Sequence, residues 1–196
     1  MNRVVVTGIG IVSSLGNNQQ EVKDSLYNTK SGISFDEDQK KMGFRSCVSG
    51  QIKIDLENSI ERKFLRFMGD GASYNYLSML EAIKDSNLSE DEISNNKTGL
   101  IMGSGGPSTK SLLRAFDITR EKGPKKIGPT SVPKVMCSTN SATLSTYFKI
   151  KGVNYSISSA CSTSAHCIGN AYELIQMGKQ NRVFAGGGEE LDWTLS

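Results

Sequence analysis

The chain has 196 residues, of which 37% are hydrophobic and 22% are charged, a composition typical of a globular protein with one core. Its 23 basic and 20 acidic residues give a net charge of +3, which is too balanced to favour nucleic acid or a membrane surface as the main partner. No stretch approaches the roughly 20 apolar residues that cross a bilayer, and residues 1–7 enter a strand pattern rather than a signal-peptide core, so we expect a cytoplasmic protein.

The first half of the chain predicts one strand and two helices. A β-branched run at 4–7, closed by glycines, predicts a buried strand that turns sharply. Asn17 and Asn18 offer caps for a helix that ends near residue 32. Residues 33–57 show little sustained period and predict a loop with short strands around 47–54. Apolar residues spaced three and four apart predict a long half-buried helix from 60 to 83.

The second half alternates strands with helices. Strands are predicted at 98–102, 154–158 and 182–185. Helices are predicted at 109–119, at 131–150 and from the turn that holds Cys161 to Gly178. This alternation indicates an α/β fold with a mostly parallel sheet flanked by helices, and no linker marks a second domain.

The four cysteines and the single histidine limit the chemistry that the chain can perform. The cysteines contain no C-x-x-C pair, and one histidine leaves too few partners for a zinc site of usual spacing. We therefore expect neither disulfides nor a metal. In a reducing compartment each cysteine is then either a core residue or a nucleophile.

Cys161 lies in the segment SSACSTSA (residues 158–165), between a predicted strand and a predicted helix. This arrangement resembles a nucleophile elbow. At a helix start, unpaired N–H groups and the positive end of the helix dipole favour a thiolate and can hold an oxyanion. The small neighbours leave room for an acyl group. The local pattern fits a buried cysteine at a tight turn equally well, because free cysteine is among the most buried residue types.

Several separated segments resemble one enzyme family. Residues 152–171, GVNYSISSACSTSAHCIGNA, closely resemble the active-site signature of the β-ketoacyl-[acyl-carrier-protein] synthases, most strongly of the synthase I type. Residues 6–16 resemble the family's opening strand and turn, and residues 182–193 resemble its strand after the nucleophile helix. Agreement in separated segments along the whole chain is a highly specific signal.

The resemblance implies a thiolase-like layered fold of two similar α/β halves, of which residues 1–196 are the amino-terminal half, and it implies a homodimer. Cys161 is then the catalytic nucleophile, which accepts an acyl chain that malonyl-carrier protein lengthens by two carbons. The family's two catalytic histidines belong to the other half, so we expect no condensation by this polypeptide alone. His166 lies off the helix face of Cys161 and is expected in a core or interface role, and Cys167 in helix packing.

Two basic clusters are expected to face acyl carrier protein, an acidic partner. Without the resemblance, both clusters fit ordinary solvated charge. The resemblance places the first cluster on the family's carrier-binding surface, and the second extends that surface. Electrostatic complementarity would then guide docking. The first cluster is Arg62, Lys63 and Arg66; the second is Lys122, Lys125 and Lys126, of which Lys122 and Lys125 extend the surface.

Gly106 and Met136 fall where the family lines its acyl pocket, Met136 reaching it from the partner subunit of the dimer. From the residues alone, a turn glycine and a core methionine fit as well. The glycines at 8–10 lack the third glycine of a dinucleotide fingerprint, and residues 103–110 lack the Gly-Lys-Ser/Thr ending of a phosphate loop. We therefore expect no cofactor.

Three other functions are alternatives to a condensing enzyme of fatty acid elongation. A polyketide condensing enzyme would share Cys161 and differ mainly in its pocket. A non-catalytic subunit of the chain-length-factor kind usually lacks the nucleophilic cysteine, which this sequence keeps. A redox sensor would need a resolving thiol, for which Cys167 is poorly placed.

Overall fold

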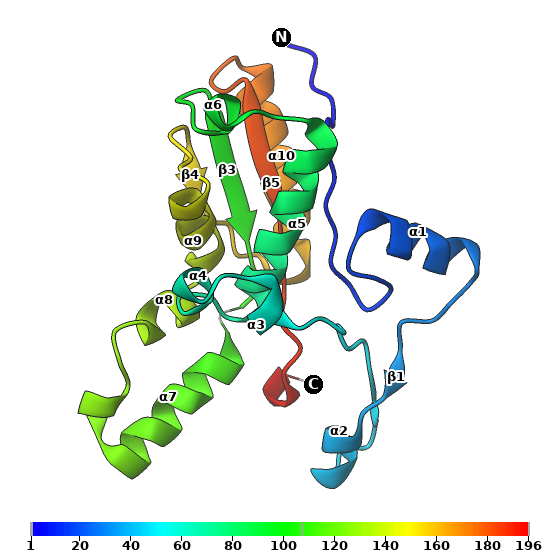
Figure 1. The fold of residues 1–196 in the computed structure, drawn as a ribbon, viewed down its shortest axis with the longest axis vertical. Coiled ribbons are helices and arrows are strands. Elements are labelled where there is room, and N and C mark those ends of the chain that lie inside the picture. Colours follow the sequence, from blue (N-terminus) through cyan, green and yellow to red (C-terminus); the bar gives the residue numbers. More distant parts are fainter. Residues whose placement is uncertain (1, 107, 196) are drawn as a thin grey trace.

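A three-stranded parallel sheet lies at the centre of the molecule, in the order β4-β3-β5 (Figure 1). The computed structural model describes residues 2–106 and 108–195. The central strand β3 (Thr98–Gly103) pairs with β4 (Asn154–Tyr155) on one side and with β5 (Arg182–Gly187) on the other. The predicted α/β fold with a mostly parallel sheet is confirmed, although β4 is shorter than predicted.

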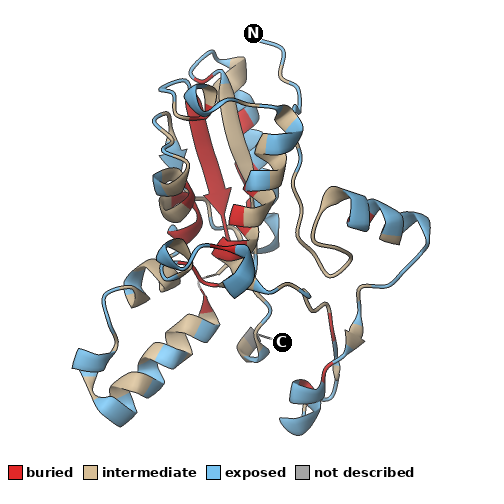
Figure 2. Ribbon diagram, in the orientation of Figure 1, coloured by how far each residue is buried: buried red, intermediate tan, exposed pale blue. Residues whose placement is uncertain are grey.

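The side chains of β3 are buried on both faces of the sheet, as Figure 2 shows for this strand. Successive side chains of a strand point to opposite faces. Leu100 and Met102 join one core cluster, whereas Ile101 joins a second cluster on the other face. This explains why residues 98–102 read as a continuous apolar run, which is typical of a strand covered by helices on both sides.

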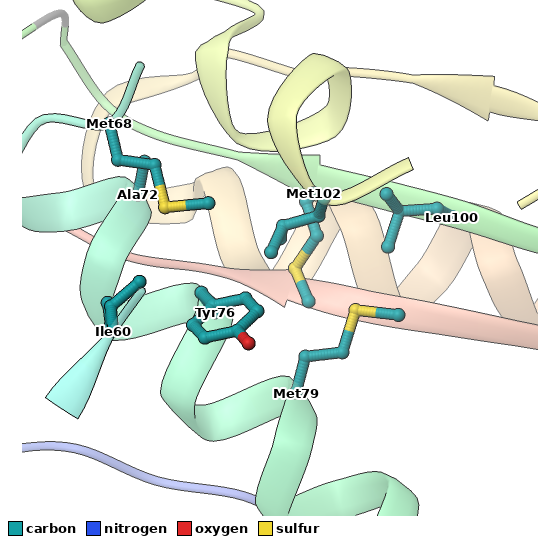
Figure 3. Packing of buried hydrophobic residues seen from close by; sticks show 8 residues of the cluster. Ile60, Met68, Ala72, Tyr76, Met79, Leu100 and Met102 are labelled. Atoms are coloured by element: carbon teal, nitrogen blue, oxygen red, sulfur yellow. The ribbon is translucent and has the colours of Figure 1, made fainter. Parts of the chain in front are cut away.

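Helices cover the two faces of the sheet. On one face lie α5 (Asp70–Ser86) and α9 (Thr139–Tyr147), and Figure 3 shows Tyr76 and Met79 of α5 close to Leu100 and Met102. On the other face lies α10 (Thr163–Gln176), whose Cys167 and Ala171 pack against Ile101. The sheet is therefore the middle layer of three.

The remaining elements lie outside these layers, and α1 (Gln19–Tyr27), β1 (Ser34–Phe35) and α2 (Glu37–Lys41) extend to one side of them (Figure 1). Near the amino terminus, α1 is capped by Asn18, as predicted. The side chain of Asn18 accepts a hydrogen bond from the N–H of Glu21. Strands β1 and β2 (Val48–Ser49) pair antiparallel. The other short helices are α3 (Leu56–Ser59), α4 (Arg62–Leu65), α6 (Glu90–Ile93) and α8 (Ser131–Val135). In the described ranges, no helix has the length and apolar character to span a bilayer.

The helix α7 (Thr109–Lys122) extends away from the sheet, as Figure 1 shows. None of its residues is buried, which agrees with the pale and tan colours of Figure 2. A short 3-10 turn, Pro124–Lys126, follows it. The helix predicted at 109–119 is confirmed and is one turn longer.

The strand predicted at 4–7 is wrong. These residues form no strand, and Val6 is 78% exposed. Both edges of β3 are occupied by β4 and β5, and this segment instead lies beside α5 (Figure 1). The N–H of Ile9 donates to the carboxylate of Asp85 at 2.9 Å. Gly10 permits this close approach, since a Cβ there would lie 1.7 Å from a carbonyl oxygen of α5.

The two long predicted helices are each interrupted. The helix predicted at 60–83 divides into α4 and α5 because Gly69, the N-cap of α5, is extended, with φ −80° and ψ 175°. A Cβ on Gly69 would lie 2.8 Å from the side chain of Ser108. The helix predicted at 131–150 divides into α8 and α9 because Met136 is extended, with φ −72° and ψ 145°. Apolar spacing identified the buried faces but not these breaks.

Candidate active site

Cys161 lies at the turn that enters α10. It is the middle residue of a 3-10 turn, Ala160–Ser162, and α10 begins at Thr163. Cys161 is exposed, whereas Cys167 of the same region is buried. The turn follows β4, at the carboxyl end of a parallel sheet, where α/β proteins commonly bind ligands. The structure confirms the predicted strand-to-helix position of Cys161, and its catalytic role stays a prediction.

The buried side chain of Thr163 fixes the shape of this turn. Ala160 adopts φ +50°, the left-handed region that residues with a Cβ rarely occupy. The Thr163 hydroxyl donates to the carbonyl of Ala160 at 2.8 Å and accepts from the N–H of Ser159 at 2.9 Å. The sequence does not point to Thr163, because its hydroxyl binds the backbone of the preceding turn rather than capping α10.

We expect Thr163→Val to destabilise the protein by about 1–3 kcal/mol and to slow alkylation of Cys161 by iodoacetamide. Valine keeps the volume but leaves the N–H of Ser159 and the carbonyl of Ala160 without this partner. Denaturant unfolding and peptide mass spectrometry of the full-length protein measure the two effects. Thr119→Val removes one hydrogen bond on α7 and should change neither quantity appreciably. Equal effects of the two substitutions would contradict this role.

Cys167 and His166, both on α10, differ in burial. Cys167 is 0% exposed, and burial raises the pKa of its thiol, so the predicted packing role is confirmed. His166 is exposed, and its Nδ1 lies 2.7 Å from the Oγ of Ser159. Of the expected core or interface role, the core position is therefore wrong, and the interface role stays a prediction. The first turn of α10 leaves this ring in solvent.

The predicted carrier-binding residues are all exposed. The first cluster is on α4 and at its carboxyl end, and the second is at the far end of α7 and in the turn after it. Lys63 forms an ion pair with Glu61 at 2.7 Å, an exposed pair that contributes little to stability. The residues are Arg62, Lys63, Arg66, Lys122 and Lys125. Exposure is what carrier binding requires, and the binding role stays a prediction.

The two predicted acyl-pocket residues do not line the same cavity. Gly106 lines a cavity of about 20 Å³ together with Lys134 and Glu190. This volume accommodates one water molecule rather than an acyl chain. Burial lowers the pKa of Lys134. Met136 follows α8 and is not among the residues that line this cavity. The acyl-pocket role of both residues stays a prediction.

Neither the other cavity nor a metal site offers an alternative centre of chemistry in the described residues. The larger cavity, of about 700 Å³, lies between residues 9–11 and α1 and contains none of the predicted site residues. No group of three or more His, Cys, Asp or Glu residues in residues 2–106 and 108–195 is arranged to hold a metal ion. Cys161 therefore remains the strongest candidate for chemistry.

A family model and curated relatives agree on one protein family. A family model described as "Beta-ketoacyl synthase, N-terminal domain" matches residues 1–193. The 3-oxoacyl-[acyl-carrier-protein] synthase 1 of Haemophilus influenzae is 56% identical over 194 residues, which cover 98% of this chain and 48% of the relative. That of Escherichia coli strain K12 is 55% identical, over 100% of this chain and 49% of the relative. The chain thus spans about half the length of the curated relatives it matches.

Solved structures show the same fold. A β-ketoacyl synthase from Burkholderia phymatum superimposes with a TM-score of 0.87 at 30% identity, over 100% of this chain and 48% of that one. A type II polyketide ketosynthase, solved in complex with its acyl-carrier protein, superimposes with a TM-score of 0.76 at 20% identity, over 97% of this chain and 52% of that one. The second likeness shows the fold alone. Together they confirm the expected thiolase-like layered fold.

Proposed function

Since the chain belongs to the β-ketoacyl synthase family, whose amino-terminal domain it matches, we propose that the protein is a β-ketoacyl-acyl carrier protein synthase of the synthase I type. The observation that carries this proposal is the exposed Cys161 at the turn that enters α10. Identity of 55–56% to synthases named 3-oxoacyl-[acyl-carrier-protein] synthase 1 supports it. The activity belongs to the full-length protein.

The proposed reaction has two covalent steps. The Cys161 thiolate attacks the thioester carbonyl of an acyl chain on acyl carrier protein, a new carbon–sulfur bond forms, the carbon–sulfur bond to the carrier breaks, and the carrier's sulfur leaves as the thiolate. Malonyl-carrier protein then loses carbon dioxide, and the electron pair left on its α-carbon attacks the acyl group on Cys161. The cysteine leaves as the thiolate, and the product is a β-ketoacyl chain longer by two carbons.

The surroundings of Cys161 suit the first step. The positive end of the α10 dipole favours a negative sulfur, and N–H groups at a helix start can hold the oxygen that becomes negative during attack. The adjacent side chains of Ser162, Ser164 and Ala165 are small, which leaves room for an acyl group. The step needs no cofactor, and we propose none beyond the pantetheine arm that carries each substrate.

The experiment that tests the activity is a single incubation of the full-length protein with acyl-carrier protein and malonyl-carrier protein. We expect one β-ketoacyl product, two carbons longer than the acyl substrate, and mass spectrometry of the carrier measures it. A polyketide enzyme would instead give a series of unreduced, repeatedly extended chains. Absence of any extended product would favour a non-catalytic subunit and would contradict the proposal.

We propose acyl carrier protein as the macromolecular partner, a homodimer as the assembly and the cytoplasm as the location, with no role for nucleic acid or membrane. The exposed basic residues of α4 and of the α7 end support the first of these, because an acidic partner is attracted to them. The solved complex of a polyketide ketosynthase with its acyl-carrier protein supports it too.

The double substitution Arg62→Glu and Arg66→Glu is expected to raise the KM for carrier-bound acyl substrate about tenfold or more. The reason is repulsion between two new carboxylates and an acidic carrier. The KM for a short acyl-pantetheine should stay unchanged, because this substrate has no protein surface. Steady-state kinetics with both substrates, at low and high salt, measure the difference.

A matched control reverses two positive charges at positions outside both basic clusters. Lys84 and Lys151 are exposed, and Lys84→Glu with Lys151→Glu should leave both KM values within about twofold. Equal effects of the Arg62 and Arg66 substitutions on both substrates would show that α4 does not bind the carrier.

A further inference from the structure

Two adjacent carboxylates after β5 hold the loop between β3 and α7. The Glu189 carboxylate accepts hydrogen bonds from the Ser104 hydroxyl at 2.9 Å and from the N–H of Gly105. The Glu190 carboxylate accepts from the N–H of Lys110 at 3.1 Å. Glu189 thus binds the start of the loop, and Glu190 binds the first turn of α7.

The part of the loop that Glu189 holds touches the nucleophile turn. A Cβ on Gly105 would lie 3.1 Å from the carbonyl oxygen of Ala160, so the two backbones are already in contact. The Ser158 hydroxyl lies 3.5 Å from the carbonyl oxygen of Gly105. Ala160 directly precedes Cys161 and is held at φ +50°. One path of contacts therefore leads from Glu189 through Gly105 to the residue before the nucleophile.

We propose that Glu189 is a positioning residue for Cys161, because its hydrogen bond to the N–H of Gly105 holds that backbone beside the turn that carries the sulfur. The inference rests on the proposed function, since it assigns Glu189 to the same site. Hydrogen bonds to a charged acceptor are stronger and shorter than those between neutral groups, which suits a residue that fixes a backbone. A misplacement of the reacting atom by about 1 Å lowers a rate about a hundredfold.

The hydrogen-bond pattern says which substitution should preserve this function. The Ser104 hydroxyl has one proton and two acceptors, the carbonyl of Gly106 at 2.6 Å and the carboxylate of Glu189. A glutamine at 189 can accept from Gly105 through its oxygen and donate to the Ser104 oxygen through its amide. The hydroxyl proton then remains for Gly106. Geometry is kept although the charge is lost.

The test measures the alkylation rate of Cys161 by iodoacetamide and the rate of acyl transfer to it, in the full-length protein. We expect Glu189→Ala to lower both rates about ten- to a hundredfold. Glu189→Gln should stay within about twofold of the unsubstituted protein, and so should Glu37→Ala, an exposed carboxylate of α2. If the alanine variant fails to fold, Glu189→Asp, one methylene shorter, takes its place and should be slowed likewise.

Three results would overturn the inference. Unchanged rates in Glu189→Ala would show that the loop does not position the nucleophile. A loss in Glu189→Gln as large as in the alanine variant would show that charge, not geometry, matters. Both of these leave the proposed function intact. If Cys161 of the unsubstituted protein reacts with neither iodoacetamide nor acyl-carrier protein, the proposed function fails and the inference fails with it.

Discussion

Replacing the nucleophile, Cys161→Ser, is expected to lower condensation by the full-length protein at least about 10³-fold, because removal of a catalytic nucleophile abolishes its covalent pathway. A serine hydroxyl is a weak nucleophile without an adjacent general base. The only histidine of the chain, His166, has its Nδ1 beside Ser159. Incorporation of radiolabelled malonyl carbon into β-ketoacyl product measures the loss.

The matched control is Cys47→Ser. Cys47 lies next to β2, and its sulfur lies 3.5 Å from the carbonyl oxygen of Phe44, so the substitution leaves the turn before α10 unchanged. We expect it to retain activity within about twofold. Normal condensation by Cys161→Ser would contradict the proposed mechanism, whereas loss in both variants would point to a general effect of serine on folding.

Truncating the centre of the sheet, Leu100→Ala, is expected to lower the free energy of unfolding by about 2–5 kcal/mol. Leu100 is 0% exposed and belongs to the larger core cluster, so its removal leaves a cavity in that cluster (Figure 3). Denaturant unfolding of the full-length protein, followed by circular dichroism, measures the change.

The matched control for this prediction is Leu26→Ala, the same substitution on α1. Leu26 is 63% exposed, so the change should lower stability by less than about 0.5 kcal/mol. The opposite order, with Leu26→Ala the more destabilising, would contradict the position of the core between β3, α5 and α9.

Strands of the central sheet and the nucleophile turn could be predicted from the sequence because each leaves a local signal. The runs at 98–102 and 182–185 are short, mostly apolar and bounded by turns, and both are strands of the central sheet. Small residues around Cys161, between a strand and a helix, likewise predicted the turn that the structure shows. These features depend on residues adjacent in the chain.

Features that depend on distant residues could not be predicted. The run at 4–7 has the composition of a strand but lies outside the sheet, and the residues that follow it contact α5 instead. Gly69 is extended before α5 and packs closely against Ser108, a contact that the sequence does not show. Glu189 follows a glycine run at the end of a strand, a position that could have marked it, but its hydrogen bonds span more than 80 residues.

The most direct test of the account is the mass of the Cys161 peptide after the full-length protein is incubated with acyl-carrier protein alone. We predict that the peptide gains one acyl group, that the Cys47, Cys137 and Cys167 peptides gain none, and that hydroxylamine, which cleaves thioesters, removes it. An acyl group on another cysteine, or no acylated peptide under conditions in which the protein condenses its substrates, would contradict the assignment of Cys161 as the nucleophile.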